Sequence, residues 1–279
     1  MPPKWSRRRA APVPLTPPPS DAGTPPANSA ACPIPATMPP AVWRAWGSCS
    51  MGDVIFEVLT WLPGLVLAIT LHEAAHGYVA NWRGDPTARL LGRLSLNPLR
   101  HVDPMGTLGL PALLFLLNAP FLFGWAKPVP VDTRNLRHPQ RDMALIALAG
   151  PSMNVFLAVV SAVLLHGVFA LPDEALRWLG TLLQKSVLIN CVLAVFNMLP
   201  VPPLDGARLL AGVLPLKAAR AFMRLEQAGM ALLFGLLFLL PMGFQVLGVD
   251  FDPFGWIVTP LVRALMGAVY VTAGNPLAP

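Results

Sequence analysis

Residues 54–80 read VIFEVLTWLPGLVLAITLHEAAHGYVA, and this stretch decides the fold. It is apolar apart from Glu57 and the cluster that begins at His72, and as a helix it can cross the roughly 30 Å hydrocarbon layer of a membrane. The whole chain shares this character, because 54% of its 279 residues are hydrophobic and only 12% are charged. A soluble domain carries about a quarter charged residues. The composition therefore predicts a polytopic membrane protein.

Further apolar stretches follow the first, and one of them is interrupted. Residues 105–125 contain Pro111, Asn118 and Pro120, which make a straight helix there unfavourable. We therefore expect an all-α membrane protein with about five transmembrane helices plus a re-entrant or interfacial segment. The predicted crossings are residues 54–80, 143–171, 179–199, 227–247 and 254–271.

Residues 1–50 differ in composition from the rest of the chain. The stretch 11–40 is dominated by Pro, Ala, Ser and Thr, which predicts a disordered tail. Because Met51 opens the first hydrophobic segment directly, we hypothesise that translation starts there. We expect a Pro/Ala-rich tail followed by one membrane-embedded domain, residues 51–279.

Basic residues outnumber acidic ones, giving a net charge of +6 and a pI of about 9.8. The Lys and Arg residues lie in short runs between apolar segments, which is the ordinary topology signal of a membrane protein. Neither a basic face nor a recognition motif for nucleic acid is present in the sequence. The lipid bilayer is therefore an expected partner, and nucleic acid is not.

The cluster in the first apolar stretch has the pattern H-E-x-x-H, formed by His72, Glu73 and His76. Residues four apart share one face of a helix, so both imidazoles can bind one ion. Zinc accepts two neutral histidines and a carboxylate, which leaves a fourth position for water. Glu73 lies beside the first ligand and can take the proton of that water as general base. Ionisable groups in an apolar segment are costly and normally functional, so we predict a site for one Zn²⁺ ion.

Asp205 is the best candidate for a third ligand. It follows an apolar stretch in the sequence NMLPVPPLDG, residues 197–206, where prolines break the helix. Irregular backbone at membrane depth is tolerated only where it lines a cavity within the protein. The alternative interpretation is a carboxylate that caps a helix in the membrane interface.

The order of these motifs resembles the site-2 protease family of intramembrane metalloproteases. In that family an H-E-x-x-H motif closes one membrane helix, and an N-x-x-P-x-P-x-L-D-G motif, which residues 197–206 match, follows much later. Residues 150–154, GPSMN, are similar to the G-x-x-x-N element between the two. The resemblance covers residues 54–225 and is to the compact bacterial branch without a PDZ domain.

The resemblance implies that residues 51–279 form a zinc metalloendopeptidase. His72, His76 and Asp205 would be the zinc ligands, and Glu73 would be catalytic. The substrate would be a membrane protein, cleaved in or near a transmembrane segment that unwinds locally. Residues 92–130, rich in Pro and Gly, could supply an edge strand or gate for the unwound peptide.

The resemblance also singles out Asn154 and Asn197. Either amide would support the ligands, hold the substrate or help to stabilise the developing oxyanion. The structural alternative is an asparagine that joins two membrane helices by a hydrogen bond.

A zinc-dependent transporter or metal sensor could use the same ligands without hydrolysis. It would need a path of further polar residues through the membrane. The middle of the stretches 143–171 and 179–199 offers few, namely Asn154, Ser161, Asn190 and Asn197. The sequence therefore favours the protease.

A shared ion constrains the topology. The C-terminal ends of residues 54–80 and 179–199 must lie on one side of the membrane, which holds only if residues 105–125 do not cross. Twelve Lys or Arg residues near the membrane then fall on one face, with Arg44 and Arg177 opposite. By the positive-inside rule, we expect the site to face the cytoplasm in a bacterial plasma membrane.

This topology predicts the location of a reporter fused after Leu99. A green fluorescent protein fused there should fluoresce, and an alkaline phosphatase should be inactive, because both would remain in the cytoplasm. An active phosphatase at this position would contradict the topology.

Overall fold

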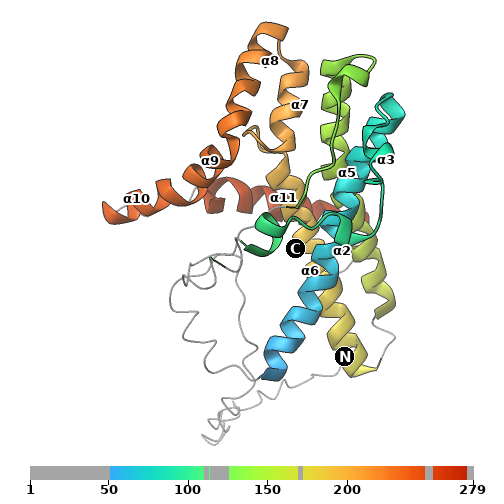
Figure 1. Ribbon diagram of the computed structural model, residues 1–279. Coiled ribbons are helices and arrows are strands. Elements are labelled where there is room, and N and C mark those ends of the chain that lie inside the picture. The colour runs from blue at the N-terminus through green and yellow to red at the C-terminus, as the bar shows by residue number, and fades with distance from the viewer. Residues whose placement is uncertain (1–50, 110–112, 114–125, 169–171, 249–253, 275–279) are drawn as a thin grey trace, which may run out of the picture.

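The computed structural model describes residues 51–109, 113, 126–168, 172–248 and 254–274. The predicted tail, residues 1–50, lies outside these ranges. Every regular element within them is helical, which confirms the all-α expectation (Figure 1). The long helices are α2 (Met51–Arg83), α5 (Pro139–Val168) and α6 (Asp173–Asn197). The shorter elements are α3 (Thr87–Leu90), η1 (Pro98–Arg100), η2 (Pro104–Gly109), η3 (Thr133–Asn135), α7 (Asp205–Val213), α8 (Leu216–Met223), η4 (Arg224–Ala228), α9 (Gly229–Phe234), η5 (Gly235–Leu239), α10 (Leu240–Val246), η6 (Phe254–Val258) and α11 (Thr259–Thr272).

Four stretches of the described chain are long and apolar enough to cross a membrane. They are α2, α5, α6 and Gly255–Thr272, which runs from η6 into α11. At 1.5 Å per residue, even the shortest of them is about 27 Å long, close to the hydrocarbon thickness. The remaining predicted crossing, residues 227–247, consists largely of the short elements α9, η5 and α10. Its passage through the membrane stays a prediction.

The three long helices pack against one another and carry the candidate site. In Figure 1, α2 and α6 run in the same direction and α5 runs in the opposite direction. Small residues allow close approach, since a Cβ atom on Gly64 of α2 would lie only 3.3 Å from the Cα of Ser186 on α6. Such contacts matter because lipid provides no hydrophobic drive for helices to associate. The parallel arrangement places the C-terminal ends of α2 and α6 at the same end of the bundle.

The segment predicted to turn back, residues 105–125, lies largely outside the described residues. Its described flanks nevertheless meet, because the backbone N–H of Lys127 donates to the carbonyl of His101 at 2.9 Å. The chain therefore enters and leaves this segment at the same level of the bundle. Among the described stretches long enough to cross a membrane, α5 and α6 lie between α2 and Asp205 along the chain, as a shared ion requires. The turn of residues 105–125 back to the same face stays a prediction.

A partly buried ion pair joins the N-terminal half of α2 to the middle of α6. The ammonium of Lys185 lies 2.6 Å from Oε2 of Glu57 and donates to Oγ1 of Thr60 at 2.8 Å. The side chains of Lys185 and Glu57 are only 15% and 18% exposed. A buried charge that loses its partner is strongly destabilising, whereas replacing the pair together is tolerated.

This pair predicts a double-mutant cycle. Glu57→Gln or Lys185→Met alone should lower the free energy of unfolding by about 3 kcal/mol, because each leaves one charge unpaired. The double variant should recover most of the loss, measured by denaturant titration of the purified protein in detergent. Arg134→Gln, which breaks an exposed ion pair with Asp132, is the control and should change little. Single variants with the same free energy of unfolding as the wild type would contradict this account of the α2–α6 contact.

Candidate metal centre

His72 and His76 project from one face of α2, one helical turn apart. Their side chains are buried, with only 7% and 8% of each residue exposed. The two rings meet edge to face, with centroids 4.7 Å apart. The spacing of four residues on a continuous helix therefore brings both imidazoles to one point, as the sequence predicts.

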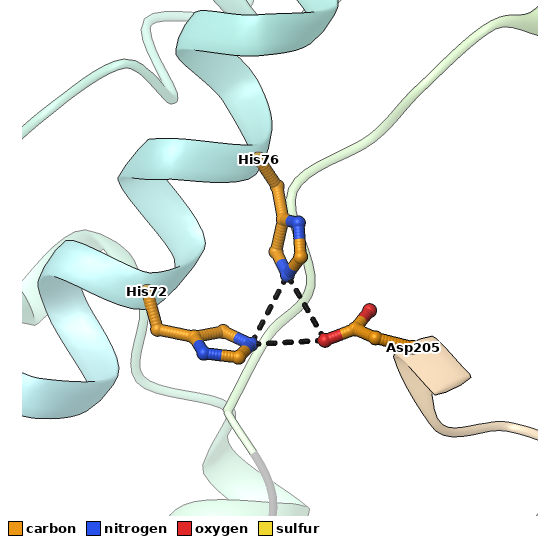
Figure 2. Close-up of side chains that lie close together, drawn as sticks. All are labelled: His72, His76 and Asp205. Atoms are coloured by element: carbon orange, nitrogen blue, oxygen red, sulfur yellow. Dashed lines mark hydrogen bonds and ion pairs between the residues drawn. The ribbon is translucent and has the colours of Figure 1, made fainter. Parts of the chain in front are cut away.

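Asp205 reaches the same point from the opposite side, at the first turn of α7 (Figure 2). α6 ends at Asn197, and the prolines that follow cannot continue its hydrogen bonding. The chain then turns so tightly that a Cβ atom on Gly206 would lie 2.2 Å from the carbonyl oxygen of Met198. Glycine is thus the residue that this turn can accommodate beside Asp205.

The three side chains place their acceptor atoms in a small triangle. Nε2 of His72 and Nε2 of His76 are 3.0 Å apart, and each lies 3.2 Å from Oδ2 of Asp205. A tetrahedral zinc site with bonds of about 2.0–2.1 Å separates its ligand atoms by roughly 3.3 Å. The triangle therefore has the dimensions of three corners of such a site.

Hydrogen bonds on the far side of each ring decide which nitrogen faces the triangle. Nδ1 of His76 lies 2.6 Å from the carbonyl oxygen of Ile146, and Nδ1 of His72 lies 2.5 Å from Oδ1 of Asn154. A carbonyl oxygen can only accept, so Nδ1 carries the proton in both rings. The Nε2 lone pairs then point at each other and at a carboxylate. Such an arrangement is stable with a cation at its centre, and the donor set fits a divalent metal.

Gly150 of α5 makes room for the two imidazoles. A Cβ atom at this position would lie 2.4 Å from Nε2 of His76 and 2.6 Å from Nε2 of His72. The glycine of the G-x-x-x-N element is therefore explained by steric contact. Asn154, one turn further along α5, supplies the partner of His72.

Glu73 faces a cavity of about 350 Å³ that the three metal-ligand candidates also line. Its Oε2 accepts a hydrogen bond of 3.0 Å from the backbone N–H of Val129. Val129 lies in a stretch without regular secondary structure, residues 126–132, that borders the cavity. The carboxylate is thus oriented beside the triangle and can exchange a proton with a molecule bound there.

Asp85 anchors the end of this stretch, residues 126–132. Its carboxylate accepts from the backbone N–H of Asp132 at 2.7 Å and from the amide of Asn135 at 2.9 Å, and it also binds Thr87. Burial raises the pKa of Asp85, but the hydrogen bonds from these partners outweigh it and hold the pKa below its usual value. The ionised carboxylate therefore fixes the wall of the cavity that contacts Glu73.

The two asparagines of the prediction occupy different places. Asn154 is fully buried, so it contacts His72 and not a molecule in the cavity. Asn197 lines the cavity, and its amide donates to the carbonyl of Leu193 in its own helix at 3.0 Å. The geometry favours a supporting role for Asn154 and places Asn197 at the cavity.

Sequence reasoning missed two backbone groups at the site, the Ile146 carbonyl and the Val129 N–H. Backbone groups carry no residue signature, so no pattern could have indicated them. Arg208, which also lines the cavity and pairs with Glu226 at 2.6 Å, could have been found from its place one turn after Asp205.

The contact at Gly150 predicts the effect of one methyl group. Gly150→Ala should weaken metal binding by about 10–100-fold or more, because the methyl group displaces both histidines. The measurement is a competition with a chelator, using purified protein. Gly167→Ala is the matched control on the same helix, since nothing lies within 4 Å of a Cβ atom there. Equal metal affinity of the two variants would contradict the proposed contact.

Comparisons with known proteins agree with this geometry. The profile of peptidase family M50 matches residues 167–242, which include Asp205. YwhC of Bacillus subtilis, named as a zinc metalloprotease, is 39% identical over 205 residues, or 71% of this chain and 90% of YwhC. Rip2 of Mycolicibacterium smegmatis, named likewise, is 33% identical over 180 residues, or 64% of this chain and 65% of Rip2. No solved structure matches the chain.

These similarities confirm the family that the motifs indicate. The match to YwhC extends over nearly the whole of that protein, and the described helices have the length and hydropathy of an integral membrane protein. The chain therefore belongs to peptidase family M50, the site-2 protease family, and is a membrane metalloprotease.

Proposed function

We propose that this protein is an intramembrane zinc endopeptidase that hydrolyses peptide bonds in or near transmembrane segments of membrane proteins. One observation carries the proposal. The acceptor atoms of His72, His76 and Asp205 converge beside the carboxylate of Glu73, in a cavity of a bundle of membrane-length helices.

Each residue has a defined part in the proposed reaction. His72, His76 and Asp205 would hold one zinc ion, which when bound would supply Lewis acidity toward the scissile carbonyl and toward the attacking water. Glu73 takes a proton from that water as the water oxygen bonds to the carbonyl carbon. It then delivers the proton to the leaving nitrogen, so the C–N bond breaks and a carboxylic acid and an amine are released. The N–H of Val129 holds one oxygen of Glu73 and leaves the other for this proton transfer.

The substrate is a membrane protein whose helix unwinds locally, because the carbonyls of an intact helix are already hydrogen bonded. The stretch 126–132 borders the cavity and contains Pro128 and Pro130, which lack an N–H. We expect the unwound peptide to lie between this stretch and α5. Asn197, which lines the same cavity, is the amide best placed to contact it.

The site faces the cytoplasm of a bacterial plasma membrane in this proposal. The supporting observation is the distribution of charge beside the C-terminal end of α2. Arg83, Arg89, Arg93 and Arg100 all lie in or directly after this end of the helix. Positive charge concentrates on the cytoplasmic side of membrane proteins, and water for hydrolysis is available there.

A transporter or metal sensor is the alternative function. Four polar residues of α5 and α6 are buried and hydrogen bonded to one another, namely Asn154, Asn190, Ser161 and Ser186. Side chains that satisfy one another are poor ligands for a passing ion. A proteoliposome that accumulated zinc through the wild-type protein would favour the alternative.

Glu73→Gln separates catalysis from metal binding. The variant should bind zinc as the wild type does but should cleave roughly 10²–10⁴-fold more slowly, because it lacks the general base. A comparison of the membrane proteomes of cells that make the wild type or the variant identifies proteins that accumulate with the variant. Purified wild-type enzyme should then cleave these proteins in detergent.

Glu174→Gln is the control for this experiment. This substitution removes an exposed carboxylate in the first turn of α6, at the end of that helix remote from Asp205. The variant should therefore cleave like the wild type. A Glu73→Gln protein with full activity would refute the proposed role of Glu73.

A further inference from the structure

A column of buried polar side chains leads from His72 into the interior of the bundle. Asn154 of α5 binds His72, and its Nδ2 donates to Oδ1 of Asn190 on α6 at 2.9 Å. Nδ2 of Asn190 donates to the backbone carbonyl of Ser186 at 2.8 Å, and Oγ of Ser186 lies 2.9 Å from Oγ of Ser161. Asn154 and Asn190 are 0% and 1% exposed, and each serine is 7% exposed.

From His72 to Ser186, each group of the column donates a hydrogen bond to the next, and the backbone carbonyl of Ser186 fixes this direction. That oxygen can only accept, so Asn190 must turn its NH₂ group toward it and its Oδ1 toward Asn154. Asn154 must then present its own NH₂ group to Asn190 and its Oδ1 to His72. The Nδ1 of His72 consequently carries the proton, and its Nε2 lone pair faces Asp205.

Asn190 also links the two halves of the metal centre. It lies on α6, the helix that leads to Asp205, while the imidazole it acts on belongs to α2. A second acceptor for the Asn154 amide, the Ala68 carbonyl, lies at 3.3 Å and belongs to α2 itself. The Asn190 bond is shorter, and it is the bond that ties the orientation of His72 to α6.

We infer that Asn190 is a positioning residue of the metal centre, which acts through Asn154 to fix the tautomer and orientation of His72. The inference rests on the proposed metal site. Groups that orient metal-binding histidines in this way typically contribute 10–100-fold to metal affinity. An asparagine that merely joins helices would contribute to folding and would leave the metal unaffected.

The test is zinc affinity, measured by competition with a chelator on the purified full-length protein in detergent. Asn190→Leu should weaken zinc binding by about 10–100-fold and should change the visible spectrum of the cobalt-substituted protein. Asn190→Ser is a second variant, smaller and still polar, whose hydroxyl can bond its own helix but is too short to reach Asn154. It should show the same loss of affinity.

Ser161→Ala is the matched control. It removes an interhelical hydrogen bond of the same column on the side away from His72, and should leave zinc affinity and the cobalt spectrum within about twofold of the wild type. The inference is overturned if Asn190→Ser binds zinc like the wild type, or if Ser161→Ala loses as much affinity. A wild type that binds zinc but cleaves nothing would refute the proposed protease while leaving this result intact.

Discussion

Three acceptor atoms that face one another within 3.2 Å, in a protein interior, form the constraint on which the rest of this structure depends. Two imidazole lone pairs and a carboxylate repel one another unless a cation lies between them. Residues around the three atoms make this arrangement possible. Gly150 leaves space for the rings, the Ile146 carbonyl and Asn154 fix their tautomers, and Gly206 permits the turn that presents Asp205.

The fold supplies the geometry through the directions of its helices. Because α2 and α6 run the same way, the histidines near the end of one and the aspartate just after the end of the other meet at one end of the bundle. α5 runs in the opposite direction and packs against both, and its Asn154 bonds to His72 of α2 and to Asn190 of α6. The hydrogen bond from Lys127 to His101 holds the flanks of residues 105–125 at the same level of the bundle.

Much of this could be predicted from the sequence, for definite physical reasons. The long apolar stretches define α2, α5 and α6, and the spacing of His72 and His76 places them on one helical face. Asp205 is the candidate third ligand because prolines break the backbone before it. The role of Asn190 cannot be predicted in the same way, although the residue is polar and lies in an apolar stretch. Its partner depends on how α6 is rotated against α5, and that rotation is set by packing.

X-ray absorption at the zinc edge of the purified protein tests the central claim most directly. The account predicts one zinc ion per chain with nitrogen and oxygen ligands at about 2.0–2.1 Å, including two imidazoles in the wild type and one in a His76→Ala protein. The absence of bound zinc, or a spectrum with sulfur ligands or unchanged by His76→Ala, would contradict it.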